Sequence, residues 1–292
     1  MTDNHRLTHA IEELYPSLSP KLRRAARYVI GSPTDVALYP LRRIAENAEV
    51  GATTLIRLAN LLGFESWDLF RANFRESLRS GSGRYYNRAR DLQMRLASRN
   101  AEHSVRDASR LLGEGLRETF ERVAPAELDR AADTIQRARR VFVIGLRSWF
   151  AAAFYFYYVA QTFTDKFILL ENRSGMMVDE LGDIGPQDVV IGMTFDPYLT
   201  ETVKVLHYAR DRGCALIAIT DSPVSPLAIA NAQVFLLPTV TTSFYQSLVP
   251  TMAFLEALLA VVVVRGGKDT VKAIREGFSR RDAFGVYWKE PD

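Results

Sequence analysis

The chain has 292 residues, of which 48% are hydrophobic and 24% are charged. This length exceeds what one compact domain usually holds, so we expect two domains, and the composition excludes a disordered or repetitive chain. The formal net charge is +3, but residues 1–100 hold 16 Lys and Arg against 10 Asp and Glu, whereas the remainder is slightly acidic. The N-terminal part is therefore the candidate for contact with phosphates.

The content of cysteine and histidine excludes several kinds of site. A single cysteine, Cys214, allows no internal disulfide and no cysteine-based zinc site, and the four histidines show no ligand spacing. We therefore predict no metal and no cofactor. The N-terminus lacks the apolar core and cleavage site of a secretory signal, so we expect a cytoplasmic protein.

Residues 244–264 form the only apolar stretch long enough to suggest a membrane span. The stretch contains Gln246, Ser247, Pro250 and Glu256, which are costly in hydrocarbon. We predict instead a helix buried beneath a sheet and no contact with a membrane. Glu256 should then have a partner or be protonated.

Two helices are predicted near the N-terminus. Ser19 can cap the first, Pro20 suits its first position, and apolar residues recur at helical spacing until Pro33 ends it. After Pro40, residues 41–48 have the spacing of a second helix of about two turns.

A short turn and a third helix follow. Residues 49–51 form the turn, residues 52–62 have an apolar stripe, and Gly63 can end the helix in a left-handed conformation. This pattern is typical of a helix-turn-helix unit, whose second helix enters the major groove of DNA. Its opposite face would carry the predicted DNA-binding residues, which are Thr53, Thr54, Arg57 and Asn60. The alternative is a helical bundle whose polar face meets only solvent.

The N-terminal pattern resembles the reader domain of the RpiR family of transcriptional regulators. The resemblance rests on L-S-P-x-x-R-x-x-A-x-Y-V-I at 18–30, I-A-x-x-A-x-V at 44–50, T-x-x-R-L at 54–58 and L-G-F at 62–64. It implies a DNA-binding helix-turn-helix domain. The family usually has Gly-Val-Ser in the turn, where this chain has Glu49, Val50 and Gly51.

The segment after the third helix is also helical in pattern. Trp67, Phe70, Phe74 and Leu78 lie on one stripe, and residues 81–83 read as a linker. An arginine-rich helical connector follows. We therefore divide the chain into a DNA-binding domain at 1–80, a linker or dimerisation segment at 81–125 and an effector-binding domain at 126–292.

The C-terminal part alternates short apolar runs with helical stretches. The runs are 141–144, 167–170, 189–193, 215–219 and 234–237. They predict a doubly wound parallel sheet, so the chain is α/β overall with an all-α N-terminal domain. Ligands of such sheets bind at the carboxyl ends of the strands.

This part resembles the sugar-isomerase (SIS) domain that RpiR regulators carry, most specifically in I-T-D-S-P-x-S-P-L-A at 219–228. The resemblance implies a site for a small effector. The effector-binding residues that we predict are Gly145, Arg147, Ser148, Thr194, Asp196, Tyr198, Thr220, Ser222, Ser243 and Gln246.

One family motif is replaced in this chain. Where the family has Ser-x-Ser-Gly-x-Thr to bind a sugar phosphate, the chain has Asp196, Pro197 and Leu199, which bring a negative charge and remove donors. We therefore expect an effector other than an ordinary sugar phosphate. Arg147 could hold a carboxylate of that effector, or it could pair with Asp196.

The proposed partners are a double-stranded DNA operator, a small-molecule effector and a second copy of the chain. Helix-turn-helix proteins usually read paired half-sites as dimers, and the aromatic run at 154–158 could form the seam or fill the core of one subunit. We predict no catalytic residue. Two alternatives are an isomerase-like enzyme, for which Glu201 is the one candidate base, and a ligand-binding module without a DNA role.

Overall fold

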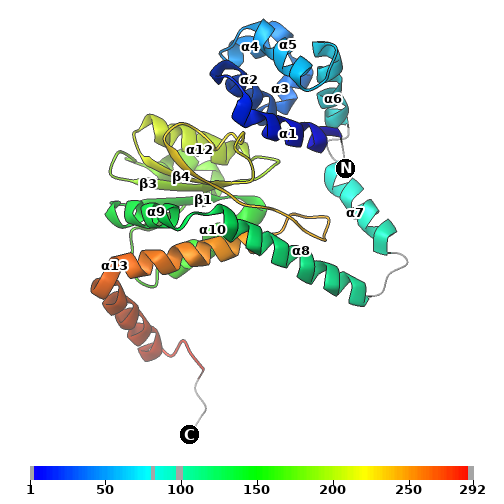
Figure 1. Cartoon of the computed structure of the whole chain (residues 1–292). Coiled ribbons are helices and arrows are strands. Elements are labelled where there is room, and N and C mark those ends of the chain that lie inside the picture. The colour runs from blue at the N-terminus through cyan, green and yellow to red at the C-terminus, as the bar shows by residue number, and fades with distance from the viewer. Residues whose placement is uncertain (1–2, 80–82, 97–100, 289–292) are drawn as a thin grey trace. The chain divides into compact units, whose positions relative to one another are not determined.

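The chain forms two compact units in a computed structural model that describes residues 3–79, 83–96 and 101–288 (Figure 1). Unit 1 comprises residues 1–111 with the segments 221–228 and 241–246, and unit 2 comprises residues 112–220, 229–240 and 247–292. The boundary lies within helix α8 (Ala101–Arg122). The division into three parts at 80 and 125 stays a prediction.

Unit 1 is all-helical, as expected. Its helices are α1 (Asp3–Leu14), α2 (Pro20–Gly31), α3 (Pro33–Leu38), α4 (Leu41–Asn47), α5 (Ala52–Leu61), α6 (Trp67–Arg79) and α7 (Gly83–Leu96). The predicted apolar stripes meet in one core that includes Leu22, Ile44, Leu55 and Phe70. Helices α2, α4, α5 and α6 therefore form because each buries one apolar face against the others.

Some details of unit 1 differ from the sequence prediction. Helices α1 and α3 were not predicted, and Pro33 begins α3 as well as ending α2. Ser19 occupies the N-cap position of α2, but its side chain makes no capping hydrogen bond. The predicted linker at Gly81 and Ser82, and the side chain of Leu78, lie outside the described residues.

Polar side chains connect the short helix α3 to its neighbours. The Tyr28 hydroxyl donates to Asp35 Oδ2 at 2.6 Å and accepts from Asn47 Nδ2 at 3.0 Å. Burial, followed by the hydrogen bond to Asp35, raises the pKa of Tyr28 to about 12. From α6, Arg71 and Arg75 donate to the Ala37 carbonyl at the end of α3. These bonds hold α2, α3, α4 and α6 together beside the turn of the predicted DNA reader.

Unit 2 contains a five-stranded parallel sheet. Its strands are β1 (Val141–Gly145), β2 (Phe167–Leu169), β3 (Val189–Met193), β4 (Ala215–Thr220) and β5 (Ala232–Leu236), in the order β2-β1-β3-β4-β5. All four pairings are parallel. The predicted doubly wound sheet is therefore confirmed, and each of its five strands matches a predicted apolar run.

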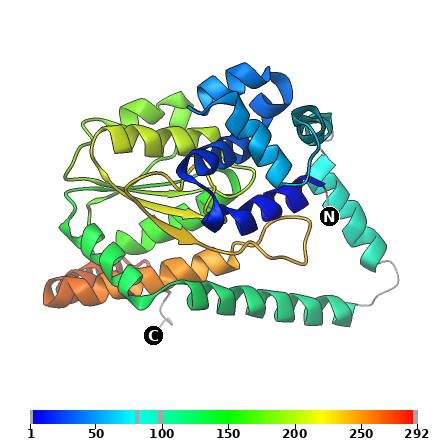
Figure 2. The ribbon, with the colours of Figure 1, turned by 45° about the horizontal axis from the view of Figure 1, so that its top comes forward.

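Helices cover both faces of this sheet (Figures 1 and 2). Helices α9 (Pro125–Arg137), α10 (Phe150–Ala160) and α13 (Val249–Ala283) pack in one core with alternate strand residues such as Val143 and Ile191. Helix α12 (Thr200–Asp211) lies on β3 and β4, so close that a Cβ on Gly192 would overlap Leu206. The short helix α11 (Met177–Leu181) precedes β3.

Helix α13 differs from the predicted helix at 244–264. It begins at Val249 and continues past a kink at Gly267, whose φ of 60° favours glycine. Its length and composition would allow a membrane span. However, Phe254, Leu255 and Leu258 lie fully buried in the core of unit 2, as predicted for a helix beneath the sheet.

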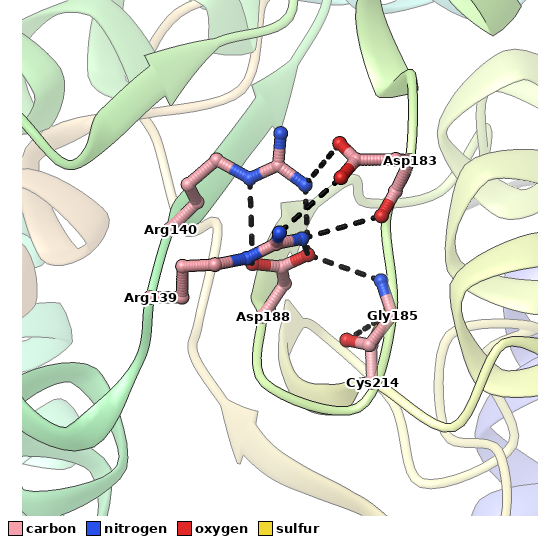
Figure 3. A network of polar contacts seen from close by, with 6 residues as sticks. All are labelled: Arg139, Arg140, Asp183, Gly185, Asp188 and Cys214. Carbon is pink, nitrogen blue, oxygen red and sulfur yellow. Dashed lines mark hydrogen bonds and ion pairs between the residues drawn. The ribbon is translucent and has the colours of Figure 1, made fainter.

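A charged network joins the amino ends of β1 and β3, and the Cys214 thiol before β4 donates to the Gly185 carbonyl beside it (Figure 3). Asp188 accepts hydrogen bonds from Arg139 at 2.7 Å, Arg140 at 3.0 Å and the Gly185 amide at 3.0 Å, and Asp183 pairs with both arginines. The Asp188 side chain is fully buried. Burial by itself would raise the pKa of Asp188, but the bonds from the arginines outweigh it and hold that pKa well below its usual range.

We predict that Asp188→Asn lowers the free energy of unfolding by roughly 2 kcal/mol at pH 7, because it removes charged hydrogen bonds from a buried site. Since the pKa of Asp188 is lower in the folded state, its contribution is present above the unfolded value near 4 and is lost as pH falls toward the folded value. The difference between wild type and Asp188→Asn should therefore stay nearly constant from pH 7 to about pH 5 and shrink from there to about pH 3 in urea titrations. Asp183→Asn, at an exposed carboxylate, should cost less. A difference that stays constant down to about pH 3 would contradict the prediction.

Candidate functional site

The first candidate site is the helix-turn-helix of unit 1. Helix α4 and helix α5 are joined by a turn in which the Val50 amide donates to the Ala45 carbonyl at 3.0 Å. Glu49 has a φ of 53°, a left-handed conformation that costs a residue other than glycine about 1 kcal/mol. Gly51 is the extended N-cap of α5, and Gly63 is left-handed after its end, as predicted. The turn therefore forms with Glu49 in place of glycine.

Helix α5 presents a polar face to solvent. Leu55, Leu58 and Ala59 are completely buried, which leaves the opposite side of the helix outside the core. Thr53, Arg57 and Asn60 are exposed and Thr54 is half-buried at the edge, as the spacing predicted. Contact of these four residues with DNA stays a prediction.

Sequence reasoning missed one member of this face. Ile56 has 37% of its surface exposed, and it lies between Thr53 and Asn60 at helical spacing. The spacing alone would have placed it there. It was missed because only polar residues were considered as candidates for contact with DNA.

The second candidate site is the carboxyl edge of the sheet in unit 2. Strands β1 and β3 are neighbours, with Gly145 paired to Met193. After β1 the chain continues to β2 on one side of this pair, and after β3 it continues to β4 on the other side. In open parallel sheets the ligand crevice lies at such a reversal of strand order. The loops after β1 and β3 therefore form the predicted effector site.

The loop after β1 is tight. A Cβ on Gly145 would lie 2.7 Å from the Trp149 carbonyl oxygen, so glycine is required there. Arg147 begins a short 3-10 helix (Arg147–Trp149) with a φ of 55°, again a left-handed conformation. Its side chain is exposed, and no described residue forms a hydrogen bond or ion pair with it. Ser148 is half-buried.

Two aromatic rings stack beside the ends of β1 and β3, in the core of unit 2. Trp149 stacks on Phe195 with ring centroids 3.9 Å apart and planes inclined by 23°. The two residues are only 3% and 1% exposed. The protein itself therefore occupies the position where the crevice of such a sheet usually opens.

Two predicted effector residues form hydrogen bonds within the protein, at the ends of β3 and β4. The Thr220 hydroxyl donates to the Thr194 carbonyl at 2.8 Å, and the Thr194 hydroxyl accepts from the Leu199 amide at 3.0 Å. Both threonines are completely buried. Their hydroxyls hold the ends of β3 and β4 in place, and a contact with an effector stays a prediction.

The other predicted effector residues fall into two groups. Asp196 and Tyr198 are half-buried in the loop after β3 of unit 2. Ser222, Ser243 and Gln246 belong to the segments of unit 1, where Ser222 is buried and accepts from the Val224 amide at 3.2 Å. The structure therefore brings together Gly145, Arg147, Ser148, Thr194, Asp196, Tyr198 and Thr220 at one edge of unit 2.

Two further predictions concern acidic residues. Glu201 lies in the first turn of α12, where its charge suits the positive end of the helix. Glu256 is exposed on α13 and accepts from the Tyr155 hydroxyl at 3.2 Å, so its predicted partner is confirmed, although the residue is not buried. Burial, and then the charge of Glu256, raises the pKa of Tyr155.

Comparisons with known proteins agree with this architecture. Residues 134–261 match the SIS domain family. A protein of Haemophilus influenzae named as an HTH-type transcriptional regulator is 23% identical over 240 residues, which are 78% of each chain. A similarly named protein of Providencia stuartii is 20% identical over 73% of this chain and 74% of its own.

Two solved structures show the same fold. The sugar isomerase domain of an RpiR transcription factor from Sphaerobacter thermophilus is 28% identical, with a TM-score of 0.54, over 56% of this chain and 92% of that one. The Vibrio vulnificus NanR protein, complexed with ManNAc-6P, is 16% identical with a TM-score of 0.55 over 95% and 98%. With the helix-turn-helix of unit 1 and the SIS domain at 134–261, the chain is similar to RpiR transcription factors.

Proposed function

We propose that unit 1 binds an operator in double-stranded DNA through α5, and that unit 2 binds a small effector which controls this binding. The observation that carries the proposal is the exposed polar face of α5 in a helix-turn-helix. Arg57 can donate two hydrogen bonds to guanine, and Asn60 can bond both polar atoms on the major-groove edge of adenine. The names of the two bacterial relatives support the same function. We propose that the protein acts in the cytoplasm and without catalysis.

The effector that fits the carboxyl edge of unit 2 carries a carboxylate. A phosphate needs several donors, but the Thr194 and Thr220 hydroxyls are completely buried, Thr220 already donates to the Thr194 carbonyl, and Asp196 adds a negative charge. The stacked rings of Trp149 and Phe195 fill the usual crevice. The guanidinium of Arg147 remains exposed, and its parallel N–H groups can donate to both oxygens of a carboxylate. The sugar phosphate in NanR is a property of that protein, and we propose a different ligand here.

The partner of unit 2 is a second copy of this chain. On α10, Phe150, Phe154 and Tyr158 stack in a row, with successive centroids 6.1 and 6.2 Å apart. Phe154 and Tyr158 are 47% and 58% exposed, whereas Phe156 is fully buried. The aromatic helix therefore both fills the core and offers an apolar face for a homodimer, which would present two copies of α5 to paired half-sites.

For DNA binding, we predict that Arg57→Ala in the full chain weakens binding at least about fivefold, since a good contact to a base contributes about 1–3 kcal/mol. The probe is a duplex recovered by selection from a random pool, and affinity is measured by fluorescence anisotropy at several salt concentrations. Arg106→Ala, at an exposed arginine of α8 that pairs with Glu102, is the control and should bind as wild type does. Equal affinity of wild type and Arg57→Ala would contradict the role of α5. Turnover of a sugar phosphate by the full chain would instead support an enzyme.

For the effector, we predict that small carboxylates raise the melting temperature of wild type and that Arg147→Gly removes this shift. Glycine tolerates the left-handed φ, so the variant should fold with a stability within about 1 kcal/mol of wild type. Arg147→Lys keeps the charge without the fork and should retain part of the shift. Stabilisation by sugar phosphates alone, unchanged in Arg147→Gly, would refute the proposed ligand class.

For the dimer, we predict that Phe154→Ser combined with Tyr158→Ser halves the mass of the full chain in analytical ultracentrifugation, because polar side chains remove the apolar face. Val271→Ser, at an exposed apolar residue of α13, is the control and should leave the mass unchanged. Circular dichroism would verify that all variants are folded. A dimer that persists in the double variant would place the seam elsewhere.

A further inference from the structure

Ile56 is an apolar side chain on the polar face of α5. It lies three residues after Thr53 and four before Asn60, next to Arg57, so the four residues share one side of the helix. Its exposed fraction is 37%, whereas Leu55, Leu58 and Ala59 are completely buried. In the described part of unit 1, Ile56 belongs neither to the core nor to the side chains that pack against it.

The folding of unit 1 does not explain an isoleucine at this position. A β-branched residue is a poorer helix former than alanine or leucine, because the preceding turn restricts its χ1. Ile56 also keeps 37% of its surface exposed, on the side of the helix that points away from the core. A β-branched side chain that stays exposed on this side is available for a contact outside its own unit.

The position of Ile56 selects the kind of contact. Residues in the N-terminal part of a recognition helix reach the base edges, and Ile56 is in the first half of α5. Leu61 is also exposed, at 46%, but it is the last residue of the helix. In the major groove the only apolar group on a base edge is the C5-methyl group of thymine.

We propose that Ile56 reads a thymine by packing on its C5-methyl group, beside the bases contacted by Arg57 and Asn60. This inference rests on the proposed DNA-binding function and adds a specific base to it. Ile56 thereby determines sequence specificity, whereas phosphate contacts contribute affinity without specificity.

The test uses the full chain and the duplex recovered by selection. Each thymine of one half-site is replaced in turn by deoxyuridine, which removes only the methyl group. Wild type should lose roughly fourfold in affinity at one thymine, the effect of exposing about one buried methylene group. Ile56→Ala should bind the thymine duplex more weakly and lose nothing further at that same position. Leu61→Ala is the matched control and should retain the wild-type loss.

The outcomes separate this inference from the function on which it rests. If no duplex is recovered, the DNA-binding function itself fails. If a duplex is recovered and Ile56→Ala shows the same deoxyuridine losses as wild type, or wild type shows none, the reading of thymine by Ile56 is overturned. Alanine favours the helix, so the variant should fold. If Ile56→Ala binds too weakly to measure, its titrations and those of wild type are repeated at lower salt. Lower salt strengthens the phosphate contacts of every complex alike.

Discussion

The stack of Trp149 on Phe195 is the interaction that determines the shape of the carboxyl edge of unit 2. The rings meet where the strand order reverses, so they occupy the place where a ligand would otherwise enter between β1 and β3. To bring Trp149 there, the chain turns closely over Gly145 and places Arg147 in a left-handed conformation. The same turn leaves the Arg147 side chain exposed. The closed crevice and the available guanidinium therefore have a common cause.

Burial determines the orientation of α5 in the same way. Leu55, Leu58 and Ala59 fix one side of the helix in the core, so the side opposite them must face outward. The turn before α5 accepts Glu49 at a position that favours glycine, and the cost of about 1 kcal/mol is small compared with the burial of three apolar side chains. A departure from the family pattern in this turn thus leaves the recognition helix in place.

The sequence predicted most features that depend on periodicity. The five strands are continuous apolar runs because helices cover both faces of the sheet, and α5 shows its buried stripe directly. The sequence could not predict which partner a side chain finds across the fold. Nothing local in the sequence shows that the ring of Trp149 meets Phe195. The hydroxyls of Thr194 and Thr220 looked free for a ligand, but Thr220 donates to the Thr194 carbonyl on the neighbouring strand, and the Thr194 hydroxyl accepts from the Leu199 amide in its own loop.

The two edges of the sheet explain how this domain can keep its fold while its ligand changes. At the amino edge, Asp188 is buried and satisfied by two arginines and a backbone amide, so a substitution there would leave charged groups without partners. At the carboxyl edge, the side chains of the loops after β1 and β3 that lie outside the core can be exchanged at smaller cost. Arg147 is exposed and Asp196 is half-buried at this second edge. Ligand specificity can therefore diverge there while the strands and the Asp188 network continue to stabilise the SIS fold.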